Sequence, residues 1–116
     1  MGSIVTDAQA LADKITQGTA EPGPAVFATV DPAAAATNRP CVLVAPPTMD
    51  YSQLTNVWPI VLLSSHPIGS LDALVQLDQL LQAVVPILSV ESAQPTAYQL
   101  TPETGPTPAY LIRVTT

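Results

Sequence analysis

Residues 70–88, SLDALVQLDQLLQAVVPIL, constrain the fold of this chain more than any other stretch. Their apolar residues recur at spacings of three and four, which is the period of one helix face. The central stripe consists of Leu74, Leu77, Leu81, Val84 and Leu88, and it is widened by Leu71, Leu80 and Val85. A stripe this wide predicts a helix that lies across a β-sheet, with Leu77 buried and Gln79 on the polar side.

Residues at both ends of this stretch predict where the helix starts and stops. Ser70 is a good N-cap, and Asp72 lies in the first turn, where the helix dipole favours a negative charge. Pro86 disfavours a helical conformation at Val85. The helix is therefore expected to begin after Ser70 and to kink at Pro86 or end near Val84.

The rest of the chain predicts a short helix before this one and several strands around it. Thr6-Asp7-Ala8-Gln9 matches a capping box, and Gly18 is a typical helix terminator. Asp31-Pro32 can open a single helical turn over residues 33–36. The strand candidates cover residues 25–30, 41–45, 57–65, 96–100 and 109–115. This order predicts one α+β domain over residues 1–116, with a mostly antiparallel sheet of about five strands.

Two connections and one proline add detail to this predicted sheet. Residues 48–56 are interpreted as a polar connection, and residues 101–108 as a connection too long for a tight turn, which should project. Pro59 lies inside a strand candidate, and because proline cannot donate to a ladder it predicts an edge position or a bulge.

The charge content limits the classes of partner. Only 10% of residues are charged, against about 25% in ordinary soluble domains. Such a chain is expected to cover part of its surface with neighbours, although a well-buried monomer is the alternative. The net charge of −6 results from nine acidic residues and three basic ones, Lys14, Arg39 and Arg113. Tight nucleic-acid binding needs clustered basic residues, so it is excluded.

Targeting and redox signals predict a soluble chain that is intracellular or redox-neutral. Cys41 is the single cysteine, so it cannot form an internal disulfide, and its apolar neighbours predict a small core residue. The N-terminus lacks the pattern of a signal peptide. No apolar run reaches membrane-spanning length.

No catalytic, metal or cofactor pattern stands out. His66 is the only histidine, and the adjacency of Ser64, Ser65 and His66 does not establish a triad. The acids are scattered singly, so no metal cluster is expected, and the glycines lie apart, so there is no phosphate loop. The chain is therefore predicted not to be an enzyme and to need no cofactor.

Four segments resemble a known family of structural proteins. They are residues 4–7 (IVTD), 40–51 (PCVLVAPPTMDY), 71–73 (LDA) with the helix that follows, and 108–110 (PAY). In their order and in their local sequences they are similar to the tail terminator proteins of long-tailed bacteriophages, particularly those that infect actinobacteria. The resemblance spans nearly the whole chain, whereas Pro59 and the Ala-rich residues 32–36 depart from it.

The resemblance implies a ring of six copies that caps the last ring of the phage tail tube. Such a ring stops tube polymerisation and offers a surface to head-closure or connector proteins, in the host cytoplasm during assembly and then in the virion. DNA would pass through its lumen without specific binding, which suits an acidic chain. The alternatives are a head-closure or connector protein of the phage neck and a small cytoplasmic binding module.

The best candidates for protein contacts are apolar and aromatic loop residues and the tip of the projecting connection. They are Met49, Asp50, Tyr51, Leu54, Glu103, Thr104, Gly105 and Pro106. For Tyr51 and Leu54 the alternative is that both side chains fold back and cover the core.

Overall fold

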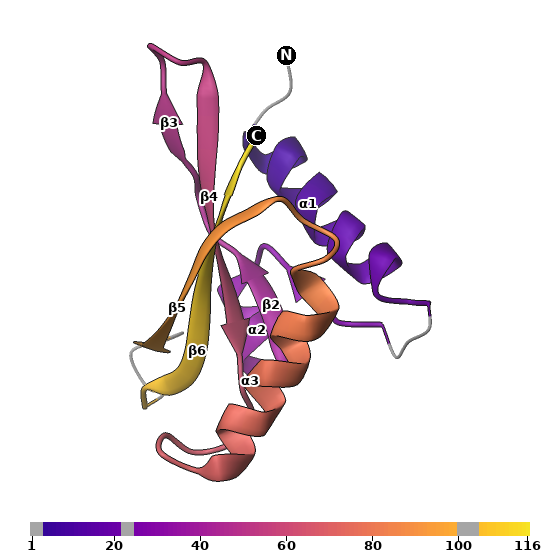
Figure 1. Ribbon diagram of the computed structural model, residues 1–116, viewed down its shortest axis with the longest axis vertical. Coiled ribbons are helices and arrows are strands. Elements are labelled where there is room, and N and C mark those ends of the chain that lie inside the picture. Colours follow the sequence, from indigo (N-terminus) through magenta and orange to yellow (C-terminus); the bar gives the residue numbers. More distant parts are fainter. Residues whose placement is uncertain (1–3, 22–24, 100–104) are drawn as a thin grey trace.

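The computed structural model describes residues 4–21, 25–99 and 105–116. These parts of the chain form three helices and six strands (Figure 1). The helices are α1 (Ile4–Gly18), α2 (Pro32–Thr37) and α3 (Leu71–Val84). The strands are β1 (Ala28–Thr29), β2 (Cys41–Val44), β3 (Thr48–Asp50), β4 (Thr55–Leu63), β5 (Val90–Tyr98) and β6 (Thr107–Thr115).

The six strands form one mixed sheet in the order β1-β2-β4-β6-β5, and β3 pairs with the start of β4. Strands β1 and β2 run parallel, whereas the other pairs are antiparallel. The predicted α+β class is confirmed, with one strand more than expected.

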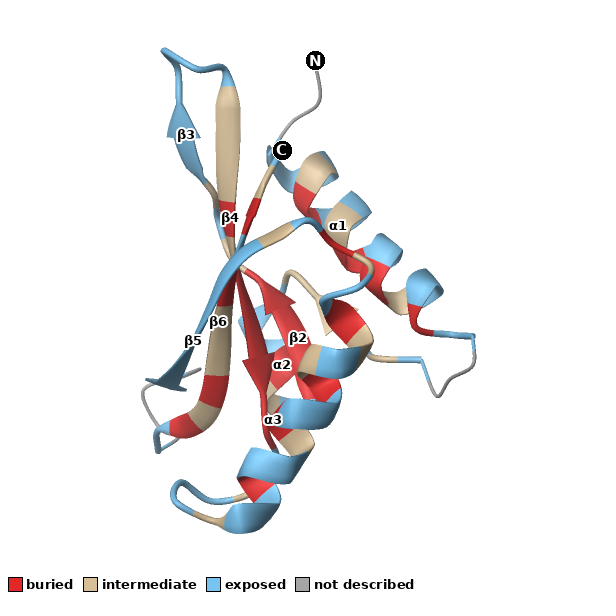
Figure 2. Cartoon of the chain, viewed as in Figure 1, coloured by how far each residue is buried: buried red, intermediate tan, exposed pale blue. Residues whose placement is uncertain are grey.

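Helices α1 and α3 cover one face of the sheet, which we call the helix side. The core there joins alternate residues of β2, β4 and β6 to buried residues of both helices. Figure 2 shows the buried stretches of these elements in red. Its sheet residues are Val42, Val44, Trp58, Ile60, Leu62, Ile112 and Val114. The opposite face carries a smaller cluster under α2, which contains Ala35, Cys41, Leu43, Val61, Leu63 and Ala109.

Helix α3 has the predicted ends but a different buried face. Ser70 Oγ accepts a hydrogen bond from Ala73 N at 3.1 Å, and the helix ends at Val84, two residues before Pro86. Its buried residues are Ala73, Leu77, Leu80 and Val84. Leu71 and Leu74, which the pattern placed on the core stripe, are exposed. The prediction was wrong for them because the apolar arc is wider than the sheet can cover, so the pattern leaves the rotation of the helix open.

Helix α1 begins at Ile4, before the predicted capping box, so Thr6 lies within the helix and the predicted N-cap is wrong. Its buried residues are Ala8, Ala12 and Ile15. Thr19 secures the C-terminal end, since its Oγ1 donates to Ile15 O at 2.7 Å and accepts from Val26 N at 2.8 Å.

The connection expected at residues 48–56 is in fact a hairpin, because β3 pairs with residues 55–57 of β4. Pro59 lies in the central strand β4, so the predicted edge position is wrong. Ala45 N donates to Pro59 O at 3.1 Å, which directs the backbone of Pro59 toward the end of β2. The position where proline lacks an N–H therefore lies where β4 changes its partner from β2 to β3. The pairing of β4 with β6 continues through Pro59.

The strand boundaries differ most at the two edges of the sheet. Strand β1 covers only two residues. Strand β5 starts at Val90, six residues earlier than predicted, and carries an irregular register between Val90 and Ser92. Residues 91–97 of β5 are all exposed. This segment contains no large apolar residue, and neither of its faces is covered by the described part of its own chain.

Candidate interaction surface

The β3–β4 hairpin projects beyond the helices at one end of the sheet (Figure 1). Its tip exposes 39% of Met49, 76% of Tyr51 and 87% of Leu54. The alternative in which Tyr51 and Leu54 fold back over the core is therefore wrong. The tip presents apolar side chains to whatever approaches it.

The turn at this tip is closed by polar groups rather than by its apolar side chains. Asp50 Oδ1 accepts hydrogen bonds from Ser52 Oγ at 2.6 Å, Ser52 N at 3.0 Å and Gln53 N at 3.2 Å. These bonds, the hydroxyl of Ser52 first, lower the pKa of the Asp50 carboxyl. Leu54 has a φ of 55°, in the left-handed region. The turn holds its shape while Tyr51 and Leu54 stay outside.

The described residues of the second predicted contact segment, Gly105 and Pro106, are exposed and lie at the other end of β4. Leu63 pairs with Ala109 there, whereas the hairpin is at the Thr55 end. Glu103 and Thr104 lie outside the described residues. Among the described residues, the two predicted segments therefore do not come together.

A hollow of about 340 Å³ lies beside Gly105 and Pro106 and is also lined by Arg39, Ser65 and His66. Arg39 Nη1 donates to Thr107 Oγ1 at 3.0 Å, so this cation helps to fix the start of β6. The sequence pattern gave no sign that Arg39 and His66 would meet here.

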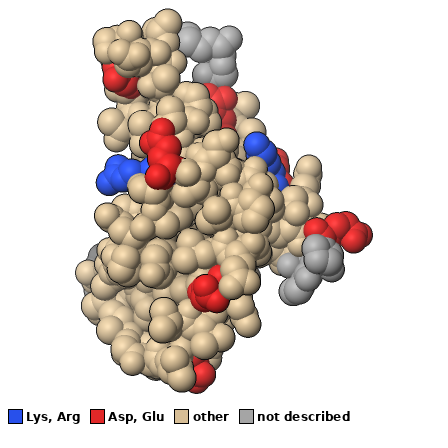
Figure 3. All heavy atoms as spheres, in the orientation of Figure 1, with Lys and Arg blue, Asp and Glu red and all other residues tan. Residues whose placement is uncertain are grey.

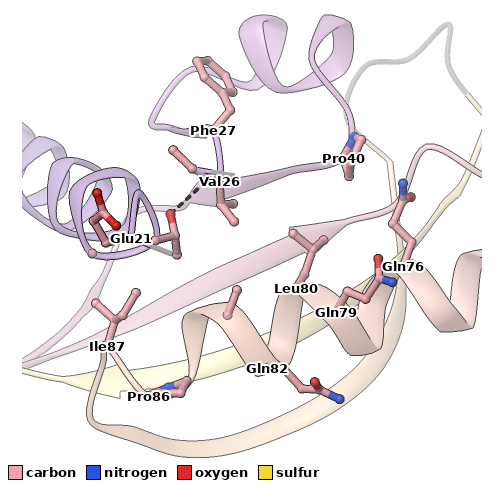
Figure 4. Close-up of a pocket in the computed structure, with 14 residues that line it drawn as sticks. Glu21, Val26, Phe27, Pro40, Gln76, Gln79, Leu80, Gln82, Pro86 and Ile87 are labelled. Carbon is pink, nitrogen blue, oxygen red and sulfur yellow. Dashed lines mark hydrogen bonds between the residues drawn. The ribbon is translucent and has the colours of Figure 1, made fainter. Parts of the chain in front are cut away.

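A larger groove of about 880 Å³ runs between the end of α1, residues 25–27 before β1, and helix α3 (Figure 4). Its walls include the apolar side chains of Val26, Leu80 and Ile87. Gln76 is held by hydrogen bonds within the fold, since its Oε1 accepts from Ser64 Oγ and from Ser65 N, each at 2.7 Å. Among the described residues of the lining, Glu21 is the one charged side chain. The described lining residues of the groove offer apolar walls and amides.

An exposed apolar surface follows the first half of α3 and was missed by the sequence reading. We call it the α3 stripe, and it comprises Ile68, Leu71, Leu74 and Val75, exposed to 53%, 73%, 56% and 49%. Leu71 and Leu74 were predicted to lie on the core stripe, whereas Ile68 and Val75 were assigned to no surface.

The Cys41 thiol is buried in the cluster under α2. Burial raises the pKa of the Cys41 thiol to about 11, opposed by the nearby charge of Arg39. The thiol donates to Ala35 O at 3.3 Å. Within the described ranges, no three His, Cys, Asp or Glu side chains gather into a metal site. In the same ranges, no helix is long and apolar enough to cross a membrane.

Charged side chains are sparse on the surface in Figure 3, where most of the visible face is neither acidic nor basic. Comparison of the chain with models of protein families, with curated proteins and with solved structures finds no match.

Proposed function

We propose that this chain is a structural virion protein that caps the head-proximal end of a phage tail tube. Six copies form a ring that ends tube polymerisation and provides the surface for joining the head. The proposal is supported by the resemblance of residues 4–7, 40–51, 71–73 and 108–110 to tail terminator proteins. It also draws on surfaces that suit assembly better than catalysis.

The projecting β3–β4 hairpin is the observation that carries the proposal. Exposed apolar groups on an acidic, sparsely charged chain favour contact with another protein. Tyr51 and Leu54 stand on a turn already closed by Asp50, so ordering them on binding costs little entropy. The hairpin is therefore assigned to the contact with the tube.

The distribution of charge fits a channel through which DNA slides. Lys14 lies on α1, Arg39 precedes β2 and Arg113 lies on β6, so the basic residues are spread over separate elements. A net charge of −6 opposes contact with phosphates. Such a ring would let DNA pass without holding it.

Co-sedimentation with purified tail tubes tests this assignment. The wild-type chain should pellet with tubes, and the double variant Tyr51→Ser, Leu54→Asn should lose at least tenfold in affinity. Val5→Ser, which makes a similar apolar-to-polar change on exposed α1, is the matched control and should bind as the wild type does. Binding to tail-less heads but not to tubes would favour the head-closure alternative.

A further inference from the structure

We infer that the hollow of about 340 Å³ lined by Arg39 and His66 is a binding site for one carboxylate group of a protein segment. We call it the Arg39 hollow, and it lies at the opposite end of β4 from the β3–β4 hairpin. The inference goes beyond the proposed tube-capping function and does not depend on it, because it assigns a ligand to a separate surface.

Arg39 brings a positive charge without a carboxylate partner into this hollow. It is one of three basic residues in a chain with nine acidic ones, yet the described lining contains no Asp or Glu. Its side chain is half-buried, and within the described part of the chain its hydrogen-bond partner is the neutral hydroxyl of Thr107. A cation that has lost part of its contact with water favours an anionic ligand.

Thr107 holds the guanidinium of Arg39 in place. Arg39 Nη1 donates to Thr107 Oγ1 at 3.0 Å, and Thr107 is 1% exposed, so this anchor lies in the body of the domain. A guanidinium carries five N–H donors in a planar fork, and this bond uses one of them. The remaining donors are free for a ligand, and a planar fork matches the two oxygens of a carboxylate.

His66 is the second ionisable side chain in the lining of the Arg39 hollow. Its backbone N donates to Ser64 Oγ at 3.1 Å, and Ser65 N donates to Gln76 Oε1 at 2.7 Å. These bonds fix the segment that carries the imidazole. Among the described residues, no group forms a hydrogen bond with the imidazole itself. A ring N–H can therefore donate to the same ligand as Arg39.

Prolines make the wall of the Arg39 hollow rigid. Pro67, Pro106 and Pro108 belong to its lining, and the pyrrolidine ring fixes φ at each of them. A wall that is already rigid loses less conformational freedom when a ligand binds. The hollow is therefore partly preorganised for its ligand.

The size and charge of the hollow favour a carboxylate over a phosphate. Its volume is near the lower end of the range for ligand pockets, so it admits a small group rather than an extended ligand. A phosphate group carries up to about two negative charges at neutral pH. The net charge of −6 repels such a group more strongly than a singly charged carboxylate.

A single ion pair near the surface is weak by itself. A free small acid would gain little from Arg39 alone, whereas a protein segment adds contacts on either side of its carboxylate. The carboxylate can come from an acidic side chain or from a chain terminus, and both present the same two oxygens to the guanidinium.

Titration of the isotope-labelled protein with blocked tripeptides tests the site through the amide signals of Ser65, His66 and Thr107. One probe has a central glutamate and an amidated C-terminus, and a second has a central glutamine and a free C-terminal carboxylate. The control has a central glutamine and an amidated C-terminus. At least one carboxylate probe should bind saturably and about tenfold or more tightly than the control, and the probe that binds identifies the source.

Three outcomes of this titration would overturn the inference. They are the absence of saturable shifts, equal shifts with all three tripeptides, and shifts spread over surfaces away from the Arg39 hollow. Inorganic phosphate at matched ionic strength is the fourth probe, and binding tighter than that of the carboxylate tripeptides would overturn the assignment to a carboxylate.

Variants of Arg39 show whether its guanidinium holds the ligand. Arg39→Gln should weaken carboxylate binding about tenfold. Arg39→Lys keeps the charge and a donor for Thr107 but loses the planar fork, so it should weaken binding by a smaller factor. Arg113→Gln, the matched control on exposed β6, removes the same charge and should leave binding unchanged. Unchanged binding by both Arg39 variants, or an equal loss with Arg113→Gln, would contradict the site.

Discussion

Leu74 and Leu77 show that two positions of one apolar pattern on α3 can have opposite roles. Both belong to the same apolar pattern, yet Leu77 is 5% exposed and Leu74 is 56% exposed. Leu77 therefore contributes to the core, and Leu74 remains available to a partner.

The first prediction compares truncations at these two leucines. Leu77→Ala should lower the free energy of unfolding by about 2–5 kcal/mol, through lost transfer energy and the cavity left behind. Leu74→Ala should change it by no more than about 0.5 kcal/mol in the monomer, because the side chain is largely in solvent. Urea denaturation at low protein concentration measures both. Equal losses at the two positions would contradict the observed rotation of α3.

The second prediction concerns the pH dependence that Cys41 confers. Its pKa rises from 9.0 to about 11 on folding because burial disfavours the thiolate. The native state then binds more protons than the unfolded state between these values. Stability is fully present below about pH 9 and should fall by up to about 3 kcal/mol as the pH rises to 11.

Cys41→Ala is the control for this effect, since it removes the thiol and leaves every other ionisable group in place. Denaturation of both chains from pH 8 to pH 11 should show the wild type losing more stability than the variant. Parallel curves would mean that the thiol ionises equally easily in both states.

At the scale of whole elements, the β3–β4 hairpin carries a residue, Leu54, that is proposed to bind a partner but does not stabilise the fold. Leu54 holds a φ of 55° that costs a branched side chain about 1–2 kcal/mol, while glycine adopts it readily.

The third prediction follows from that backbone conformation. Leu54→Gly should raise the free energy of unfolding by up to about 1 kcal/mol, because relief of strain exceeds the added freedom of the unfolded chain. The same variant should weaken co-sedimentation with tubes. Thermal melts and pelleting assays measure the two effects. A loss of more than about 1 kcal/mol would indicate that Leu54 packs on the body of the domain.

Element boundaries were predictable where local chemistry is decisive. Ser70 and Pro86 mark the ends of α3 through capping and sterics, which act on neighbouring residues alone. The apolar run of β2 was equally clear because both faces of the strand are covered. Strand β3 was missed because its three residues are all exposed and carry no burial pattern.

The candidate surfaces were predictable only in part. Tyr51 and Leu54 were named as candidates because large apolar residues stand out in a polar connection, and both are exposed. The α3 stripe was missed because sequence periodicity gives the width of an apolar arc but not the share that tertiary packing covers. The exposure of β5 depends on where α3 lies on the sheet, which no local pattern encodes.

For the whole molecule, charge gives the fourth prediction. With three basic residues on separate elements and a net charge of −6, affinity for duplex DNA should be negligible at physiological salt. A gel shift at micromolar protein checks this. A shifted band that survives such salt would contradict the proposed passage of DNA through the ring.

The most direct test of the tube-capping function is the length of tails made without this chain. A tube ring exposes the same surface after each addition, so growth stops only when another protein covers that surface. Phage lacking the gene should build tails longer than normal that fail to join heads, as measured by negative-stain microscopy of tail lengths and free heads. Normal-length tails without heads would favour the connector alternative. Normal, infectious particles would contradict the proposed function.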